Sequence, residues 1–228
     1  MQSKQKNQKS AIAIISFTDS YAQNKQRKQN EQQESESTLS LAQVTSRLKQ
    51  LWRQIHDKKS RKQVTQIPKL LQSLIALVTF RLGTHLRKEM DLLRLEVRHQ
   101  SRQCLWNIHF YGDEYVQSEL VIIGYGRVMS ISFSTAGGIG DEKDEEISYG
   151  LYRISRFLSE LHEGRNWQPS FQPLPLLVRM SLEQIEDEGA NEELEAQINN
   201  KGVNGRIKGW ANDAKAVTLN RFIHRGRT

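Results

Sequence analysis

The residue types that most often carry catalysis or bind metals are scattered along this sequence rather than grouped. Its six histidines form no HExxH pair, and none makes a close pair with the single cysteine, Cys104. The glycine-rich stretch at 137–140 has neither the GxGxxG form nor the following Lys-Ser or Lys-Thr of a phosphate-binding loop. The acidic runs at 141–146 and 186–188 are typical of helix caps and solvated surface, not of a catalytic pair. We therefore predict no enzyme activity, no catalytic residue, no metal and no cofactor.

The chemistry that remains is binding, and the charge distribution is its first sign. Residues 1–64 hold thirteen Lys and Arg against five Asp and Glu, whereas the whole chain holds 33 against 26, a net charge of +7. A basic segment of this kind is typical of an arm that binds nucleic acid, an anionic membrane or an acidic protein groove, or of a solvated tail. Because residues 1–38 are polar and of low complexity, we predict that they are disordered.

Hydropathy and cysteine content give no sign of a membrane or secreted protein. A single cysteine cannot form an intrachain disulfide, which fits a reducing compartment. The longest apolar stretch, 70–82, includes polar residues and is shorter than the roughly 20 residues that a membrane span needs. The apolar patch at 11–17 is short for the core of a secretory signal, and a polar run follows it. We predict no membrane segment.

Apolar residues recur every three or four positions from residue 39 onward, which predicts an all-α protein. We expect a first helix over 39–55, a break at 56–62 and a second helix over 67–78. One or two helices over 92–108 should end near Gly112, and Asp113 should open the next one. The remaining helices, separated by turns with glycine or proline, are expected over 147–161, 176–185, 194–198 and 207–222.

Two stretches are less clearly decided by their pattern. Residues 121–133 are rich in β-branched side chains and could form a strand, but a helix after Gly126 fits the helical neighbours better. Residues 134–146 predict a loop whose acidic end suits a helix N-terminus. The comparable helix ends at Ile108 and Leu161 lie farther apart than the roughly 40–47 residues of armadillo and HEAT units, so this loop would be an insertion. Periodicity alone leaves a helical repeat or an irregular helical bundle.

Three segments, which together fall within residues 92–223, resemble the importin-α family. Segment 104–128 has Asn107-Ile108 at a helix end, Gly112-Asp113 at a turn and Gly126 at the next helix end, as the family's repeat unit does. Segment 157–180 is similar to a family stretch through Leu158-Ser159, Gly164-Arg165, Pro169-Ser170-Phe171 and Leu174-Pro175. Segment 184–223 is similar to the last repeat, in which an acidic turn with glycine precedes two helices.

The resemblance implies an armadillo-type right-handed helical solenoid of about four repeats over residues 39–228, after the tail 1–38. In that family an extended basic peptide lies between Trp walls and Asn clamps that are spaced four apart on one helix face. The positions that match here, and that the resemblance therefore assigns to peptide binding, are Asn107, Gln103, Glu160 and Arg156. Three of them depart from the family pattern: Glu160 could attract a basic peptide, whereas Arg156 would repel one.

The tryptophans do not complete this array of Trp walls and Asn clamps. Trp106 lies next to Asn107 and would point about 100° away from it on an ideal helix. We expect Trp52, Trp106 and Trp210 to pack in the core or between repeats, and Trp167, among prolines, to pack on the surface in a loop.

The leading interpretation of the function is an importin-α-like adaptor that binds nuclear-localisation-type peptides and moves between cytoplasm and nucleus. Its partners would be a cargo protein or peptide and, through the basic segments at 4–28 and 58–62, importin-β. No membrane partner is expected, nor is nucleic acid in this interpretation. Two alternatives stay open: a general armadillo scaffold without transport activity, and a basic-tailed protein associated with nucleic acid.

Overall fold

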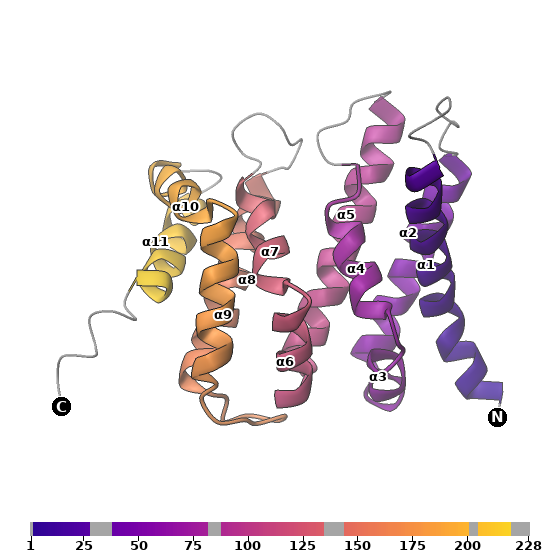
Figure 1. Cartoon of the computed structure of the whole chain (residues 1–228), viewed down its shortest axis with the longest axis horizontal. Helices are drawn as coiled ribbons and strands as arrows, with labels where there is room; N and C mark the ends of the chain where they lie inside the picture. Colours follow the sequence, from indigo (N-terminus) through magenta and orange to yellow (C-terminus); the bar gives the residue numbers. More distant parts are fainter. Residues whose placement is uncertain (1, 28–37, 82–87, 135–143, 201–204, 220–228) are drawn as a thin grey trace. The chain divides into compact units, whose positions relative to one another are not determined.

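The computed structural model describes residues 2–27, 38–81, 88–134, 144–200 and 205–219, and this part of the chain is helical throughout its regular structure. It contains eleven helices and no strand, only an isolated antiparallel bridge between Arg165 and Phe171. The all-α prediction is confirmed. The helices, coloured in chain order in Figure 1, are α1 (Gln2–Arg27), α2 (Thr38–His56), α3 (Lys58–Thr65), α4 (Leu70–Val78), α5 (Lys88–Tyr111), α6 (Glu114–Ile122), α7 (Tyr125–Ser134), α8 (Asp144–Glu163), α9 (Pro175–Asp187), α10 (Ala190–Asn199) and α11 (Arg206–Leu219).

The chain divides into two compact units, which we call unit 1 (Met1–Phe110) and unit 2 (Tyr111–Thr228). This division does not coincide with the expected boundary between a tail at 1–38 and a domain at 39–228, because α1 packs on α2, α3 and α4 within unit 1. No described helix has both the length and the apolar character needed to cross a bilayer.

Helix α1 shows that the prediction of disorder was wrong for residues 2–27; residues 28–37 lie outside the described part. Ala11 and Ile14 lie three positions apart on the same face of α1 and are fully buried. One turn further on, the hydroxyl of Thr18 donates to Ser73 Oγ on α4 at 2.9 Å, and Phe17 packs on Phe80 with ring centroids 5.7 Å apart. The apolar stripe is narrow, so the average composition of the segment concealed it.

A second correction concerns the break expected at 56–62, where the structure has helix α3. Asp57 is its N-cap: the carboxylate accepts from the Ser60 amide at 3.0 Å and from the Ser60 hydroxyl at 2.7 Å. Arg61, in the basic cluster, donates from Nε to Ile55 O at 2.8 Å and from Nη2 to His56 O at 2.9 Å, at the C-terminal end of α2. A capped helix of eight residues was therefore mistaken for a polar loop.

Several local predictions hold. Residues 88–111 form one helix, and Asp113 caps α6 by accepting from the Val116 amide at 3.1 Å. The ambiguous stretch at 121–133 is helical on both sides of a turn at 123–124 and contains no strand. Helix α7 begins at Tyr125, just after Gly124 at φ +85°, so the predicted helix start after Gly126 was two residues late. The acidic residues 144–146 occupy the first turn of α8, while residues 135–143 of the expected loop and residues 220–222 of the last helix lie outside the described part.

Unit 2 is built around α8, the longest of its helices. Leu151, Phe157, Leu158 and Leu161 of α8 are fully buried, and Phe157 meets Tyr125 of α7 edge to face at 4.8 Å. Helix α7 packs on α8 and α10 packs on α11; in addition, α8 lies against α11 and α7 lies against α10. The two helix pairs are therefore in contact through both members, and α9 packs on α7, α8 and α10.

In unit 1, Cys104 should serve as an internal probe of folding. It is fully buried on α5, its Sγ lies 3.5 Å from Leu48 O of α2, and burial raises the pKa of the thiol far above its ordinary value. Because the thiolate is the reactive form, we expect reaction with a disulfide reagent at pH 8 to be at least about 100-fold slower in native protein than in urea. Stopped-flow absorbance measures both rates, and a fast native reaction would contradict this packing of α5 on α2.

Candidate functional site

Two of the four predicted peptide-binding residues lie one turn apart on α8. Arg156 Nε donates to Glu160 Oε1 at 2.6 Å, an i,i+4 ion pair in which the arginine is 41% exposed and the glutamate 6% exposed. The Glu160 carboxylate is thus buried in unit 2, while the Arg156 guanidinium lies at the surface of the unit.

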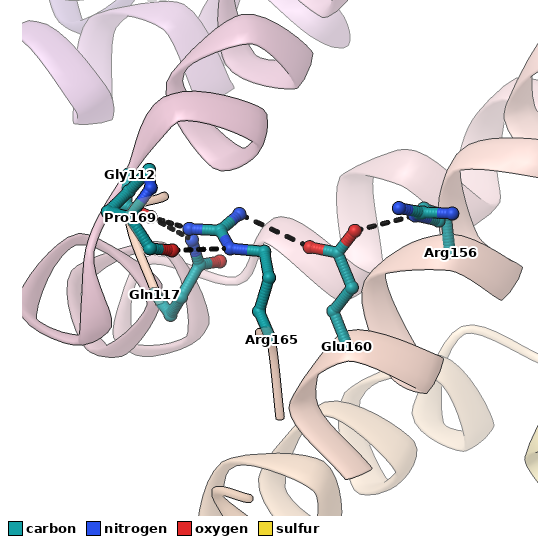
Figure 2. Close-up of polar contacts among 6 residues, drawn as sticks. All are labelled: Gly112, Gln117, Arg156, Glu160, Arg165 and Pro169. Carbon is teal, nitrogen blue, oxygen red and sulfur yellow. Dashed lines mark hydrogen bonds and ion pairs between the residues drawn. The ribbon is translucent and has the colours of Figure 1, made fainter. Parts of the chain in front are cut away.

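A third residue, Arg165, ties this pair to two other segments of unit 2. Its side chain is fully buried; Nη1 lies 3.3 Å from Glu160 Oε2, and Nε donates to Pro169 O at 2.8 Å. Its Nη2 donates to Gly112 O, which also accepts from Gln117 Nε2 at 3.1 Å. Figure 2 shows the Arg165 guanidinium between the Glu160 carboxylate on one side and the backbone oxygens on the other. Burial lowers the pKa of Arg165 from its ordinary value, and the Glu160 carboxylate opposes that shift. We call Arg156, Glu160 and Arg165 the arginine clasp.

The clasp also shapes the turn that follows α8. The backbone of Arg165 pairs with that of Phe171 in both directions, with N–O distances of 2.8 and 3.0 Å. The Arg165 guanidinium lies over the ring of Trp167 at 4.4 Å and over the ring of Phe171 at 4.6 Å. Trp167 therefore lies in a turn, as its sequence surroundings predicted. The structure adds that its ring packs on the Arg165 guanidinium.

A polar cleft of about 460 Å³ opens between the C-terminal half of α8 and the turn at 164–173. All three residues of the arginine clasp line this cleft. Its lining also includes Ser159, Asn166 and Ser170, whose side chains can donate and accept hydrogen bonds. Two guanidinium groups already share the Glu160 carboxylate, so this cleft presents little net negative charge to a basic peptide. Its chemistry favours hydrogen bonding to a peptide backbone over capture of a cation.

The other two predicted residues lie on α5 in unit 1. Asn107 is 8% exposed, and its Nδ2 donates to the Gln103 carbonyl oxygen at 2.8 Å, one turn back on the same helix. The Gln103 side chain is half-buried, with its Nε2 3.5 Å from His99 Nε2. The Asn107 amide is thus used within its own helix. That all four positions line one peptide groove stays a prediction.

The structure brings together a second group of side chains in unit 2, which we call the α8–α11 cleft. It encloses about 500 Å³ and has aromatic walls from Tyr149 and Tyr152 of α8 and Trp210 of α11. Tyr152 and Trp210 meet edge to face at 4.7 Å, and Tyr149 is 49% exposed, with the Arg153 guanidinium 5.6 Å from its ring centre. The charged residues of its lining are Asp144, Glu145 and Asp213 against Arg206.

The sequence contains a residue spacing that matches the α8–α11 cleft, but this spacing indicates a cleft only once the packing of α11 on α8 is known. Acidic and aromatic residues of α8 recur at three- and four-residue spacing from 144 to 152, and the same spacing holds on α11 from 206 to 213. The predictions of a helix N-terminus for the acidic residues and of core or inter-repeat packing for Trp210 agree with the structure, but neither indicates a cleft. In the structure Trp210 is half-buried, between α8 and α11 and beside an open cleft.

No known protein family, curated protein or solved structure matches the chain. The resemblance to importin-α therefore depends on the three sequence segments alone.

Proposed function

We propose that this chain is a helical-repeat adaptor that binds an extended segment, rich in lysine and arginine, of another protein, as importin-α proteins do. The observation that supports it most directly is the stacking of the pair α7–α8 on the pair α10–α11. A helix pair cannot bury its apolar face alone, and stacking such pairs is how helical repeats form a core and a continuous binding surface. In this proposal the pairs are armadillo-type units.

Three helix ends lie at glycines of the matching segments, whereas Gly126, which the resemblance places at a helix end, lies in the first turn of α7. Gly112 and Asp113 separate α5 from α6, Gly164 follows α8 at φ +77°, and Gly189 precedes α10 at φ +67°. Left-handed glycines such as Gly164 and Gly189 commonly end one helix and redirect the chain into the next. Transport between cytoplasm and nucleus, with importin-β as a second partner, belongs to the same proposal.

The experiment compares two fluorescein-labelled peptides on the full chain: one with five consecutive Lys and Arg between Gly-Ser flanks, the other with alanine at those five positions. We expect the basic peptide to bind at least about tenfold more tightly in fluorescence anisotropy near physiological salt, a difference of about 1.4 kcal/mol. Equal affinity of the two peptides, or no binding of either, would overturn the adaptor proposal.

A matched arm of the same titration tests the nucleic-acid alternative. Deleting residues 1–64 would remove α1 to α3 from unit 1, so substitution of charge is the cleaner probe. Lys58, Lys59 and Lys62 are exposed on α3, and changing all three to glutamine should leave peptide affinity unchanged. If a single-stranded oligonucleotide binds more tightly than the peptide, and the triple variant and added salt both weaken it, the nucleic-acid alternative is favoured.

A further inference from the structure

The α8–α11 cleft combines two features that together select one kind of ligand. Its walls are aromatic rings, and its charged lining is three carboxylates against one guanidinium. It lies on the first half of α8, whereas Arg156 and Glu160 lie on the second half and line a different cleft. None of the four predicted peptide-binding residues, and no residue of the arginine clasp, lines the α8–α11 cleft.

The geometry of the rings leaves aromatic surface available. In an edge-to-face pair, the edge of one ring meets one face of the other, so Tyr152 covers at most one face of Trp210. Trp210 is half-buried and lines the cleft. Tryptophan has the strongest attraction of the aromatic side chains for a cation above its ring.

The charges of the cleft favour the same ligand. Asp144, Glu145 and Asp213 are all exposed, so their carboxylates remain hydrated and lose little solvation when a cation approaches. Arg206, also exposed, is the one positive group in the lining and partly offsets them. The remaining field still attracts a positive group.

We propose that the α8–α11 cleft binds an arginine side chain of the partner peptide, an inference that takes from the proposed function the idea that the partner is a basic peptide. A planar guanidinium can stack on Trp210 while its edge donates to Asp213 or to the carboxylates at the start of α8. The volume of about 500 Å³ also leaves room for peptide backbone on either side of the residue.

Gly209 gives a way to block the cleft without disturbing the fold. It lines the cleft, and a Cβ built there meets no heavy atom within 4 Å. Gly209→Leu therefore projects a side chain into open space, and it replaces a poor helix former in the first turn of α11. We expect normal helicity, an unchanged or higher melting temperature, and loss of arginine binding.

The test uses the full chain labelled with ¹⁵N, and the indole Nε1–H resonance of Trp210 as the readout, assigned with Trp210→Phe. The probes are a Gly-Ser-Arg-Ser-Gly peptide with blocked ends and its citrulline twin, which keeps the shape but lacks the charge. We expect the arginine peptide to shift the Trp210 resonance and the citrulline peptide to leave it in place. Asp213→Asn should weaken binding by about three- to tenfold and Arg206→Gln should tighten it by about two- to fivefold, both effects shrinking in high salt. Glu183→Gln, an equal change of charge on α9 outside the cleft, should leave affinity unaltered.

The outcomes separate this inference from the proposed function. If the long basic peptide binds but the Trp210 resonance does not move, or if Asp213→Asn and Arg206→Gln leave affinity unchanged, the arginine site is wrong and the adaptor proposal stands. If the arginine peptide shifts Trp210 but the long basic peptide binds no better than its alanine version, the arginine site stands and the adaptor proposal fails. If deleting residues 220–228, which contain Arg221, Arg225 and Arg227, raises probe affinity tenfold or more, the occupant is the chain's own end and not a partner.

Discussion

Replacing Arg165 with methionine is expected to destabilise unit 2 by about 3–5 kcal/mol, the usual effect of breaking a buried, hydrogen-bonded ion pair. The variant keeps the length of the side chain but loses the ion pair to Glu160, the bonds to the carbonyl oxygens of Gly112 and Pro169, and the contacts over Trp167 and Phe171. Arg156 still pairs with Glu160, and Gln117 still donates to Gly112 O. The Glu160 carboxylate and the Gly112 carbonyl oxygen therefore each keep one hydrogen-bond donor. This residual pairing keeps the expected loss in the lower part of the range.

Urea unfolding, followed by tryptophan fluorescence and by circular dichroism, measures the effect. Arg179→Met is the matched control: Arg179 is also an arginine paired with a glutamate, at 2.9 Å, but it is 70% exposed on α9. Exposed ion pairs of this kind contribute roughly 0–1 kcal/mol. Equal losses for Arg165→Met and Arg179→Met would mean that the arginine clasp does not hold unit 2 together.

The second large effect is expected at Gly164, where alanine should lower the free energy of unfolding by about 3 kcal/mol or more. Gly164 follows α8 at φ +77°, a left-handed conformation that disfavours residues with a Cβ. A Cβ there would lie 2.7 Å from Phe171 O, 2.9 Å from Pro173 N and 3.0 Å from Gln172 C. All three are backbone atoms of the turn that Arg165 holds, so no side-chain rotation relieves the contact.

Gly189 is a natural control for this substitution. It follows α9 in the same left-handed conformation, at φ +67°, but a Cβ there meets only Glu192 Oε2, at 3.7 Å. Gly189→Ala therefore has the conformational penalty alone, about 1–2 kcal/mol. The difference between the two variants isolates the close approach of the 171–173 backbone to the end of α8, and a difference near zero would refute that approach.

Both predictions concern the packing of the turn at 164–173 against the C-terminal end of α8, and these two segments line the polar cleft. Loosening the turn at 164–173 should disorder one wall of that cleft and leave the α8–α11 cleft, at the other end of α8, intact. Arginine-peptide binding to Gly164→Ala, measured below the temperature at which this variant unfolds, therefore shows whether the two clefts act independently.

The helical elements could be predicted from the sequence where their signals are local. The Asp113 cap, the glycines after α8 and α9 and the heptad-like spacing of buried leucines in α8 depend on residues within four or five positions of one another. The two misjudged segments failed for related reasons. Helix α1 was hidden by polar composition around a narrow apolar stripe, and α3 by a cap at Asp57 that was not recognised.

The candidate sites could not be predicted in the same way. The matching positions on α5 and α8 were found by resemblance, but the sequence did not show that Asn107 donates to its own helix or that Glu160 is shared by two arginines. Arg165 reaches Gly112, which lies 53 positions earlier in the chain, and no periodicity signals such a contact.

By itself, then, the sequence determined an all-α chain, most of its helix ends and a basic first quarter, because hydrogen bonding, capping and amphipathic spacing act over one or two turns. Only the tertiary structure decided which helix faces meet. Packing α11 beside α8 placed Trp210 against Tyr152 and set Asp213 in a cleft with the acidic start of α8. Such contacts depend on the complementary shapes of apolar surfaces far apart in the chain, which local pattern does not encode.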